Sequence, residues 1–118
     1  MNNETKTLDA KAVLAGFPTA AVEAVMEFRD SPTTENLDAA LRAVIEFYLP
    51  RAQRRALAGL PAETRLREDL GVDSLTLAEL AFKCDELFGV SIEMHEVAGV
   101  TTLGDVLALV ETKLREAR

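Results

Sequence analysis

The sequence predicts an all-α fold, and three observations support that prediction. Ala, Leu and Val supply most of the apolar mass, while only 5% of the 118 residues are aromatic, and this balance favours helices over strands. Apolar residues recur at helical spacing in several segments, and no useful length of chain alternates with the two-residue period of a strand. Gly and Pro separate those segments. The length suits a single domain that buries its core without disulfides.

Two helices are expected in the first 32 residues. Residues 8–15 can form a short helix that stops at Gly16. Pro18 can open a second helix, since proline is tolerated at the first helical position, and the Asp-Ser-Pro sequence at 30–32 breaks the chain. The apolar face of the second helix is expected to contain Val22, Val25, Met26 and Phe28.

The next helix is expected to start at a threonine cap, Thr33 or Thr34, and Pro50 ends it. Residues 51–60 are expected to be helical too, because a Gly-Leu-Pro sequence then supplies an end signal. This connection to the following helix is rich in arginine. The helix that ends at Pro50 is expected to carry an apolar stripe of Leu37, Leu41, Val44, Ile45 and Tyr48.

A third long helix is predicted to begin at Ser74, with Asp73 or Ser74 as its cap, and to end at Gly89. Its inward face should contain Leu77, Leu80, Ala81, Cys84, Leu87 and Phe88, while Thr76, Glu79, Lys83 and Glu86 face water.

The last part of the chain predicts a short helix at 94–98, ended by Gly99, and then a long helix capped by Thr101 or Thr102. Ile92 is expected to anchor the turn before the short helix in the core. The buried side of the last helix should contain Val100, Leu103, Val106, Leu107, Val110 and Leu114.

Acidic residues outnumber basic ones by 20 to 13, so the net charge is −7. Nucleic-acid binding is disfavoured, since neutralising phosphates needs a basic face, and basic protein partners are favoured. The lone Cys84 reads as a small core residue, and His95, the only histidine, lacks a ligand set for a metal. No run is long and apolar enough to span a membrane, and no signal peptide is recognised, so we expect a cytoplasmic protein.

The sequence Asp73-Ser74-Leu75, where a loop becomes a helix, resembles the prosthetic-group site of acyl carrier proteins. The tripeptide alone is ordinary helix-cap sequence, but its context extends the resemblance from about residue 34 to 113. The matching stretches are Leu-Arg-Glu-Asp-Leu-Gly at 66–71, Glu-Leu at 79–80, Phe-Gly-Val-Ser-Ile at 88–92 and Val-Thr-Thr-Leu-Gly-Asp-Val at 100–106.

This resemblance implies a four-helix carrier bundle with a short third helix over residues 33–118, preceded by a helical extension at 1–32. It implies that Ser74 carries 4′-phosphopantetheine, whose thiol holds acyl groups as thioesters for fatty-acid, polyketide or specialised lipid biosynthesis. The chain would then be a carrier and not an enzyme. A serine at a helix N-terminus suits this role, because the free N–H groups there favour a phosphodiester anion, and Leu70 and Leu75 can pin the loop around it to the core.

The expected partners are a phosphopantetheinyl transferase and the enzymes that load and process acyl chains. Residues 69–96 carry seven acids and one base, which would speed the encounter with basic docking patches. The positions implied for partner recognition are Asp73, Leu75, Ala78, Glu79, Phe82, Asp85 and Glu86. The apolar residues expected to shelter an acyl chain are Leu66, Leu70, Leu80, Phe82, Val97, Val100 and Leu103.

The departures from the family pattern favour a specialised carrier over a housekeeping one. Lys83 interrupts the acidic face, the Arg-rich connection is long, and the extension has no counterpart in typical fatty-acid synthesis carriers. Two alternatives stay open: a discrete aminoacyl or peptidyl carrier, and an unmodified helical interaction module, against which the intact motif argues. An independent hydrolase or transferase is disfavoured because no base partners the serine.

Overall fold

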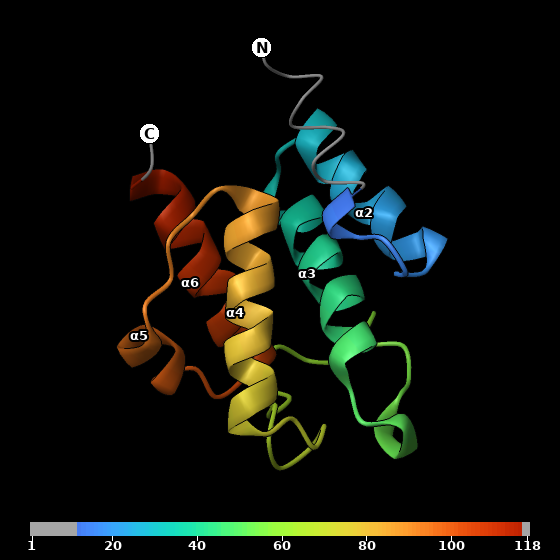
Figure 1. Cartoon of the computed structure of the whole chain (residues 1–118), viewed down its shortest axis with the longest axis vertical. Coiled ribbons are helices and arrows are strands. Elements are labelled where there is room, and N and C mark those ends of the chain that lie inside the picture. Colours follow the sequence, from blue (N-terminus) through green and yellow to red (C-terminus); the bar gives the residue numbers. More distant parts are fainter. Residues whose placement is uncertain (1–11, 117–118) are drawn as a thin grey trace.

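The computed structural model describes residues 12–116. Three long helices, α3 (Thr34–Tyr48), α4 (Ser74–Phe88) and α6 (Leu103–Glu116), lie side by side, with α2 (Thr19–Asp30) at one edge of the molecule and the short α5 (Met94–Ala98) at the opposite edge (Figure 1). The described residues form no β-strand, and a single isolated bridge joins two loop positions. The all-α prediction is therefore confirmed. No helix among residues 12–116 is both long and apolar enough to cross a membrane.

Local capping sets the ends of the helices as the sequence predicts. Thr33 caps α3 by accepting a hydrogen bond from the backbone N–H of Asn36 at 3.1 Å. Gly89 ends α4 in the left-handed conformation, at φ 67°. Thr102 caps α6 by accepting from the backbone N–H of Asp105, whose carboxylate accepts in turn from the Thr102 N–H. Each cap joins residues three or four positions apart, which is why the sequence alone narrows each N-cap to two adjacent residues and locates the end at Gly89.

The core lies where α2, α3, α4 and α6 meet, and the predicted apolar faces of these helices contribute to it. Several predicted core residues pack only partly buried at its edge: Ala81, Phe88, Ile92, Val100, Leu107 and Leu114. The residues buried in the central cluster include Val25, Leu37, Leu41, Val44, Ile45, Leu77, Leu80, Cys84, Leu87, Leu103, Val106 and Val110.

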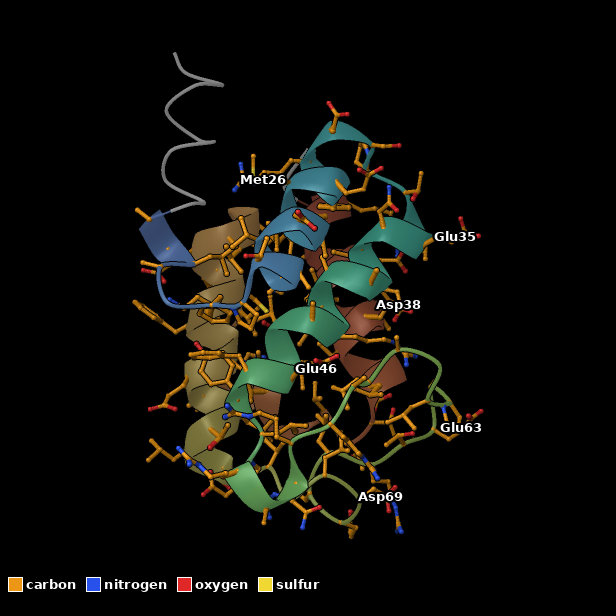
Figure 2. All side chains as sticks on the ribbon, turned by 90° about the vertical axis from the view of Figure 1, so that its right-hand side faces the viewer. Met26, Glu35, Asp38, Glu46, Glu63 and Asp69 are labelled. Atoms are coloured by element: carbon orange, nitrogen blue, oxygen red, sulfur yellow. The ribbon has the colours of Figure 1, made fainter. Side chains whose placement is uncertain are left out.

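The helix predicted over 51–60 is wrong. Only Arg51–Gln53 form a single 3₁₀ turn, labelled η1. Beyond it, tertiary hydrogen bonds take the backbone groups that a helix would pair internally: the Leu57 N–H donates to Glu46 of α3 at 2.9 Å, and the Leu57 carbonyl accepts from Arg42 of α3 at 2.8 Å. Leu57 is fully buried. Figure 2 shows this connection running past the end of α3 that carries Glu46.

The described part of the extension packs on α3 and α4. Leu14 and Val25 are buried in the same core as α3 and α4. The Phe17 ring stacks on Phe47 of α3 with centroids 4.0 Å apart. Arg29 of α2 donates to the Leu87 carbonyl in the last turn of α4 at 2.6 Å. Half of the helix predicted at 8–15 lies outside the described residues, and the predicted boundary at residue 32 falls in the segment between α2 and α3.

Lys83 does not face water as predicted. Its side chain is 20% exposed, and its ammonium group donates to the Val13 carbonyl at 3.1 Å and pairs with Glu86 at 3.3 Å. The extension accounts for this difference, because it covers the flank of α4 on which Lys83 lies. The charge of Lys83 is thus held between the extension and α4 instead of projecting from the acidic face.

Candidate functional site

The loop before α4 holds Ser74 in place through backbone hydrogen bonds to other parts of the chain. The Leu66 N–H donates to the Thr101 carbonyl at 2.8 Å, and the Val72 N–H donates to the Leu66 carbonyl at 2.9 Å. The Leu103 N–H returns a bond of 3.0 Å to the Thr64 carbonyl. The bonds to Thr101 and from Leu103 pin the loop to the start of α6, the Val72 bond closes the loop on itself, and three buried side chains pin it to the core. Those side chains are Leu66, Leu70 and Val72.

Gly71 makes the tight turn that the sequence predicts before the site. Its φ is +74°, a left-handed backbone conformation that is unfavourable for residues with a Cβ. A Cβ at this position would also come within 3.2 Å of the Cγ of Gln53 and 3.5 Å of the Cγ of Pro50. The turn therefore depends on glycine both for its backbone angles and for its close approach to the connection after α3.

Replacing Gly71 by alanine is expected to lower the free energy of unfolding by about 1–2 kcal/mol, the cost of a left-handed conformation. Gly99→Ala is the matched control: Gly99 has φ −87°, and its nearest neighbour atom would lie 3.7 Å from the new Cβ. That change should stay within about 0.5 kcal/mol. Urea denaturation measures the free energy of unfolding of both variants. Equal values for Gly71→Ala and Gly99→Ala would contradict the role given to Gly71.

Asp73 caps α4, which decides between the two candidate caps. Its carboxylate accepts a hydrogen bond from the backbone N–H of Thr76 at 2.8 Å. This bond is the main cause that lowers the pKa of Asp73 below its usual value, with a smaller contribution from the positive charge of Arg67. Asp73 is therefore ionised at neutral pH, and the cap leaves the hydroxyl of Ser74 free for other chemistry.

The hydroxyl of Ser74 lies exposed on the first residue of α4 and accepts a hydrogen bond from Nη2 of Arg67. A guanidinium cannot act as a general base, because arginine stays protonated in proteins. His95 lies exposed on α5, with its Nδ1 3.6 Å from a carboxylate oxygen of Glu93. Within residues 12–116, no three His, Cys, Asp or Glu side chains are grouped to hold a metal ion. The arrangement presents a hydroxyl beside a cation and supplies no catalytic dyad.

A groove of about 460 Å³ opens beside Ser74 and runs toward α5. Its walls combine the charged side chains of Arg67 and Glu68 with apolar side chains from α4 and α5. An exposed hydroxyl, an adjacent cation and a groove leading from them fit an arm that is attached through a phosphodiester and extends along the protein. The lining residues are Arg67, Glu68, Ser74, Leu77, Met94, Val97, Ala98, Val100 and Thr101.

A smaller apolar cavity, of about 30 Å³, lies between α4, α5 and α6. Of the residues predicted to shelter an acyl chain, Leu80, Val97 and Val100 line it. Leu66, Leu70 and Leu103 are buried but do not line it. Phe82 was misassigned to this interior, because its side chain is 64% exposed.

Cys84 also lines the apolar cavity. Burial raises the pKa of its thiol to about 12. The thiol is therefore protonated at neutral pH and unreactive as a nucleophile. Its position agrees with the prediction of a small core residue.

The exposed apolar side chains gather on α4 and at the start of α5. Leu75 and Phe82 are 69% and 64% exposed and lie seven residues apart on one face of α4, so Leu75 does not pin the loop to the core as predicted. Met94 is 63% exposed. The sequence did not indicate it as a surface residue for partners, since it marked only the first residue of the short helix. The assignment of these side chains to partner recognition stays a prediction.

The acidic residues predicted on α4 differ in their surroundings. Glu79 and Glu86 are exposed, and Ala78 between the apolar side chains is half-buried. Asp85 is half-buried, and its carboxylate accepts from the Ile92 N–H at 3.0 Å. Burial raises the pKa of Asp85, an effect opposed by that hydrogen bond. Asp85 therefore helps to hold the connection between α4 and α5, in addition to any surface role.

Comparison with known proteins places this site in a family. Residues 51–110, just over half of the chain, match the phosphopantetheine attachment site family. The acyl carrier protein of an Exiguobacterium species is 38% identical over 55 residues, which cover 47% of this chain and 70% of that protein. The acyl carrier protein of Thermotoga maritima is 36% identical over 52 residues, covering 44% and 64%.

The meromycolate extension acyl carrier protein of Mycobacterium tuberculosis is 41% identical over 49 residues, which cover 42% of each chain. The chain thus spans from less than half to about two thirds of the lengths of these relatives. No solved structure gave a significant match. The matched segment contains the pinned loop, the exposed serine and the helices on both sides of the groove, and the chain accordingly belongs to the acyl carrier protein family, whose members carry acyl groups for lipid biosynthesis on a covalently attached 4′-phosphopantetheine.

Proposed function

We propose that Ser74 is the attachment site for 4′-phosphopantetheine and that the chain carries acyl intermediates as thioesters. The observation that carries this proposal is the exposed hydroxyl of Ser74 on the first residue of α4, held by a pinned loop and left free by the Asp73 cap. When bound, the group supplies the thiol that forms the thioester. The chain itself supplies a fixed site and contributes no catalytic step.

The attachment reaction follows from the chemistry of that hydroxyl. The Ser74 oxygen bonds to the phosphorus of the pantetheine phosphate of coenzyme A, the bond of that phosphorus to the leaving phosphate breaks, and 3′,5′-ADP departs. The hydroxyl proton must go to a base. Since the neighbour of the Ser74 oxygen is the Arg67 guanidinium, we assign the base to a separate phosphopantetheinyl transferase.

The exposed face of α4 is the surface proposed for partner enzymes. Leu75 and Phe82 supply apolar contact area, and Glu79 and Glu86 supply negative charge that complements basic docking patches. These partners are the transferase and the cytoplasmic enzymes that load and process acyl chains. Within the chain, we propose that residues 33–118 are the carrier domain and 1–32 an addition to it, and the packing of residues 13–29 on α3 and α4 supports this division.

We propose a specialised lipid or polyketide pathway as the setting. The extension beside α4 and the position of Lys83 between them support this choice, since both change the partner surface of a typical carrier. The names of the curated relatives favour an acyl cargo over an aminoacyl one.

The test is mass spectrometry after incubation of the chain with coenzyme A and a broad-specificity phosphopantetheinyl transferase. The intact chain is expected to gain one phosphopantetheine unit. Trypsin should then place the added mass on the peptide 68–83, whose only hydroxyl side chains are those of Ser74 and Thr76, and fragment ions should assign it to Ser74. A folded chain that gains no mass would contradict the proposal and favour the unmodified interaction module.

A further inference from the structure

The arginines near the site differ in what they bind. Arg54 donates to the carbonyls of Phe47 and Leu49 at 3.0 Å, and Arg65 pairs with Asp69 at 3.5 Å. These side chains fasten the connection to the bundle or to itself. Arg67 instead directs Nη2 to the hydroxyl of Ser74 and lines the groove that opens there. Arg67 therefore differs from Arg54 and Arg65 in that its hydrogen bond goes to the side chain of the serine.

Modification of Ser74 would change what this guanidinium meets. The serine oxygen becomes a bridging ester oxygen, and two unesterified oxygens that share a negative charge lie one bond beyond the phosphorus. A guanidinium that already reaches the serine oxygen is close enough to bind them, and its planar fork matches two phosphate oxygens at once. The charged oxygens are stronger acceptors than the hydroxyl that they replace.

The same groove determines the direction of the arm. Arg67 and Ser74 line it together with Met94 and Val97 of α5 and with Val100, which follows α5. A phosphate fixed at the serine would let the arm lie over those apolar side chains instead of extending into solvent. Glu68 also lines the groove, and its negative charge opposes the phosphate. Arg67 should therefore favour binding of the phosphodiester in the groove, and Glu68 should oppose it.

We propose that Arg67 is a positioning residue, which binds the phosphodiester on Ser74 and directs the prosthetic arm into the groove beside α5. The proposal rests on attachment at Ser74. The sequence assigned no function to Arg67, which appeared there as one of several arginines in a long connection and as part of the matching stretch 66–71.

The experiment uses the full chain after modification, with conversion verified by intact mass before any spectrum is recorded. Four variants are compared with the unmutated chain: Arg67→Gln, Arg67→Lys, Glu68→Gln and Arg55→Gln. Arg55 is the matched control, because it is an exposed arginine of the same connection that does not line the groove. The readouts are the ³¹P chemical shift of the phosphodiester and the nuclear Overhauser effects between the pantetheine methyl groups and Val97 or Val100.

Arg67→Gln is expected to shift the ³¹P resonance and to remove the Overhauser effects, while Arg55→Gln leaves both unchanged. Arg67→Lys keeps the charge without the fork and should retain part of the effects. Glu68→Gln should strengthen them. Added salt should move the ³¹P shift of the unmutated chain toward that of Arg67→Gln, since it screens exposed charges.

The outcomes separate the two proposals. An unmutated chain that gains no mass contradicts attachment itself, and the positioning role falls with it. Full conversion with identical spectra for Arg67→Gln and the unmutated chain overturns the positioning role alone. If only the Arg67 variants failed to gain the phosphopantetheine mass, Arg67 would act in the encounter with the transferase. That result would also overturn its positioning role.

Discussion

Replacement of Ser74 by alanine is expected to abolish the gain of the phosphopantetheine mass completely. Ser74 provides the hydroxyl oxygen that must bond to phosphorus, and no neighbouring side chain can substitute for it. Thr76 is half-buried, and its backbone N–H is held by Asp73. Since the Asp73 carboxylate provides the cap, the free energy of unfolding should change by less than about 0.5 kcal/mol. Intact mass and thermal unfolding measure the two effects separately.

Ser91→Ala is the matched control for this experiment, because Ser91 is also exposed but lies beyond the other end of α4. That variant should gain the full mass. If Ser74→Ala kept the mass gain, attachment would lie at another hydroxyl and the assigned site would be wrong. If Ser74→Ala lost both its mass gain and its helical circular dichroism, the serine would have a structural role that its exposed position does not suggest.

Removal of residues 1–30 is expected to destabilise the carrier strongly. The deletion strips Leu14 and Val25 from a core that they share with α3 and α4, and it removes the bond from Arg29 to the Leu87 carbonyl. Leu14→Ala alone should lower the free energy of unfolding by about 2–5 kcal/mol, as expected for a fully buried leucine. The whole deletion should exceed that loss, which is a large part of the stability of an ordinary domain.

Glu23→Ala is the control for a substitution in α2 that removes no buried side chain, because Glu23 lies on the exposed side of that helix. Its effect should stay within about 0.5 kcal/mol. Urea denaturation and size-exclusion chromatography of the deletion, Leu14→Ala and Glu23→Ala form one data set. Unchanged stability after the deletion would contradict packing on the bundle. An unchanged oligomeric state would contradict a second hypothesis for the apolar face of Val22, Val25, Met26 and Phe28, that it joins two copies of the chain.

The structural role of the extension bears on function because it lies against α4. Lys83 is held by the Val13 carbonyl on the flank that the extension covers, whereas Leu75 and Phe82 project from the exposed face. The extension therefore limits the side from which a partner can approach α4. If Ser74 is the attachment site proposed above, partner enzymes have to reach it over the uncovered face of α4, which is consistent with the proposed specialised role.

The elements whose signals are local were determined by the sequence itself. Thr33, Asp73 and Thr102 cap their helices through bonds to residues three positions away, and Gly89 ends α4 because it adopts a left-handed angle. The place of Ser74 at the start of α4 follows from the same local signals, whereas the proposal that it is the attachment site also needs the matching stretches between residues 66 and 106.

Only the tertiary structure decided the features that join distant parts of the chain. Leu57 lies in an irregular connection because Arg42 and Glu46 of α3 bind its backbone. Lys83 is withdrawn from water by a carbonyl 70 positions away, and Phe82 points outward although helical spacing left its side undecided. Arg67 meets Ser74 only because the loop folds back on the start of α6. Periodicity and capping report interactions within one turn of helix, whereas these contacts depend on how the helices pack, which the pattern of a single segment does not contain.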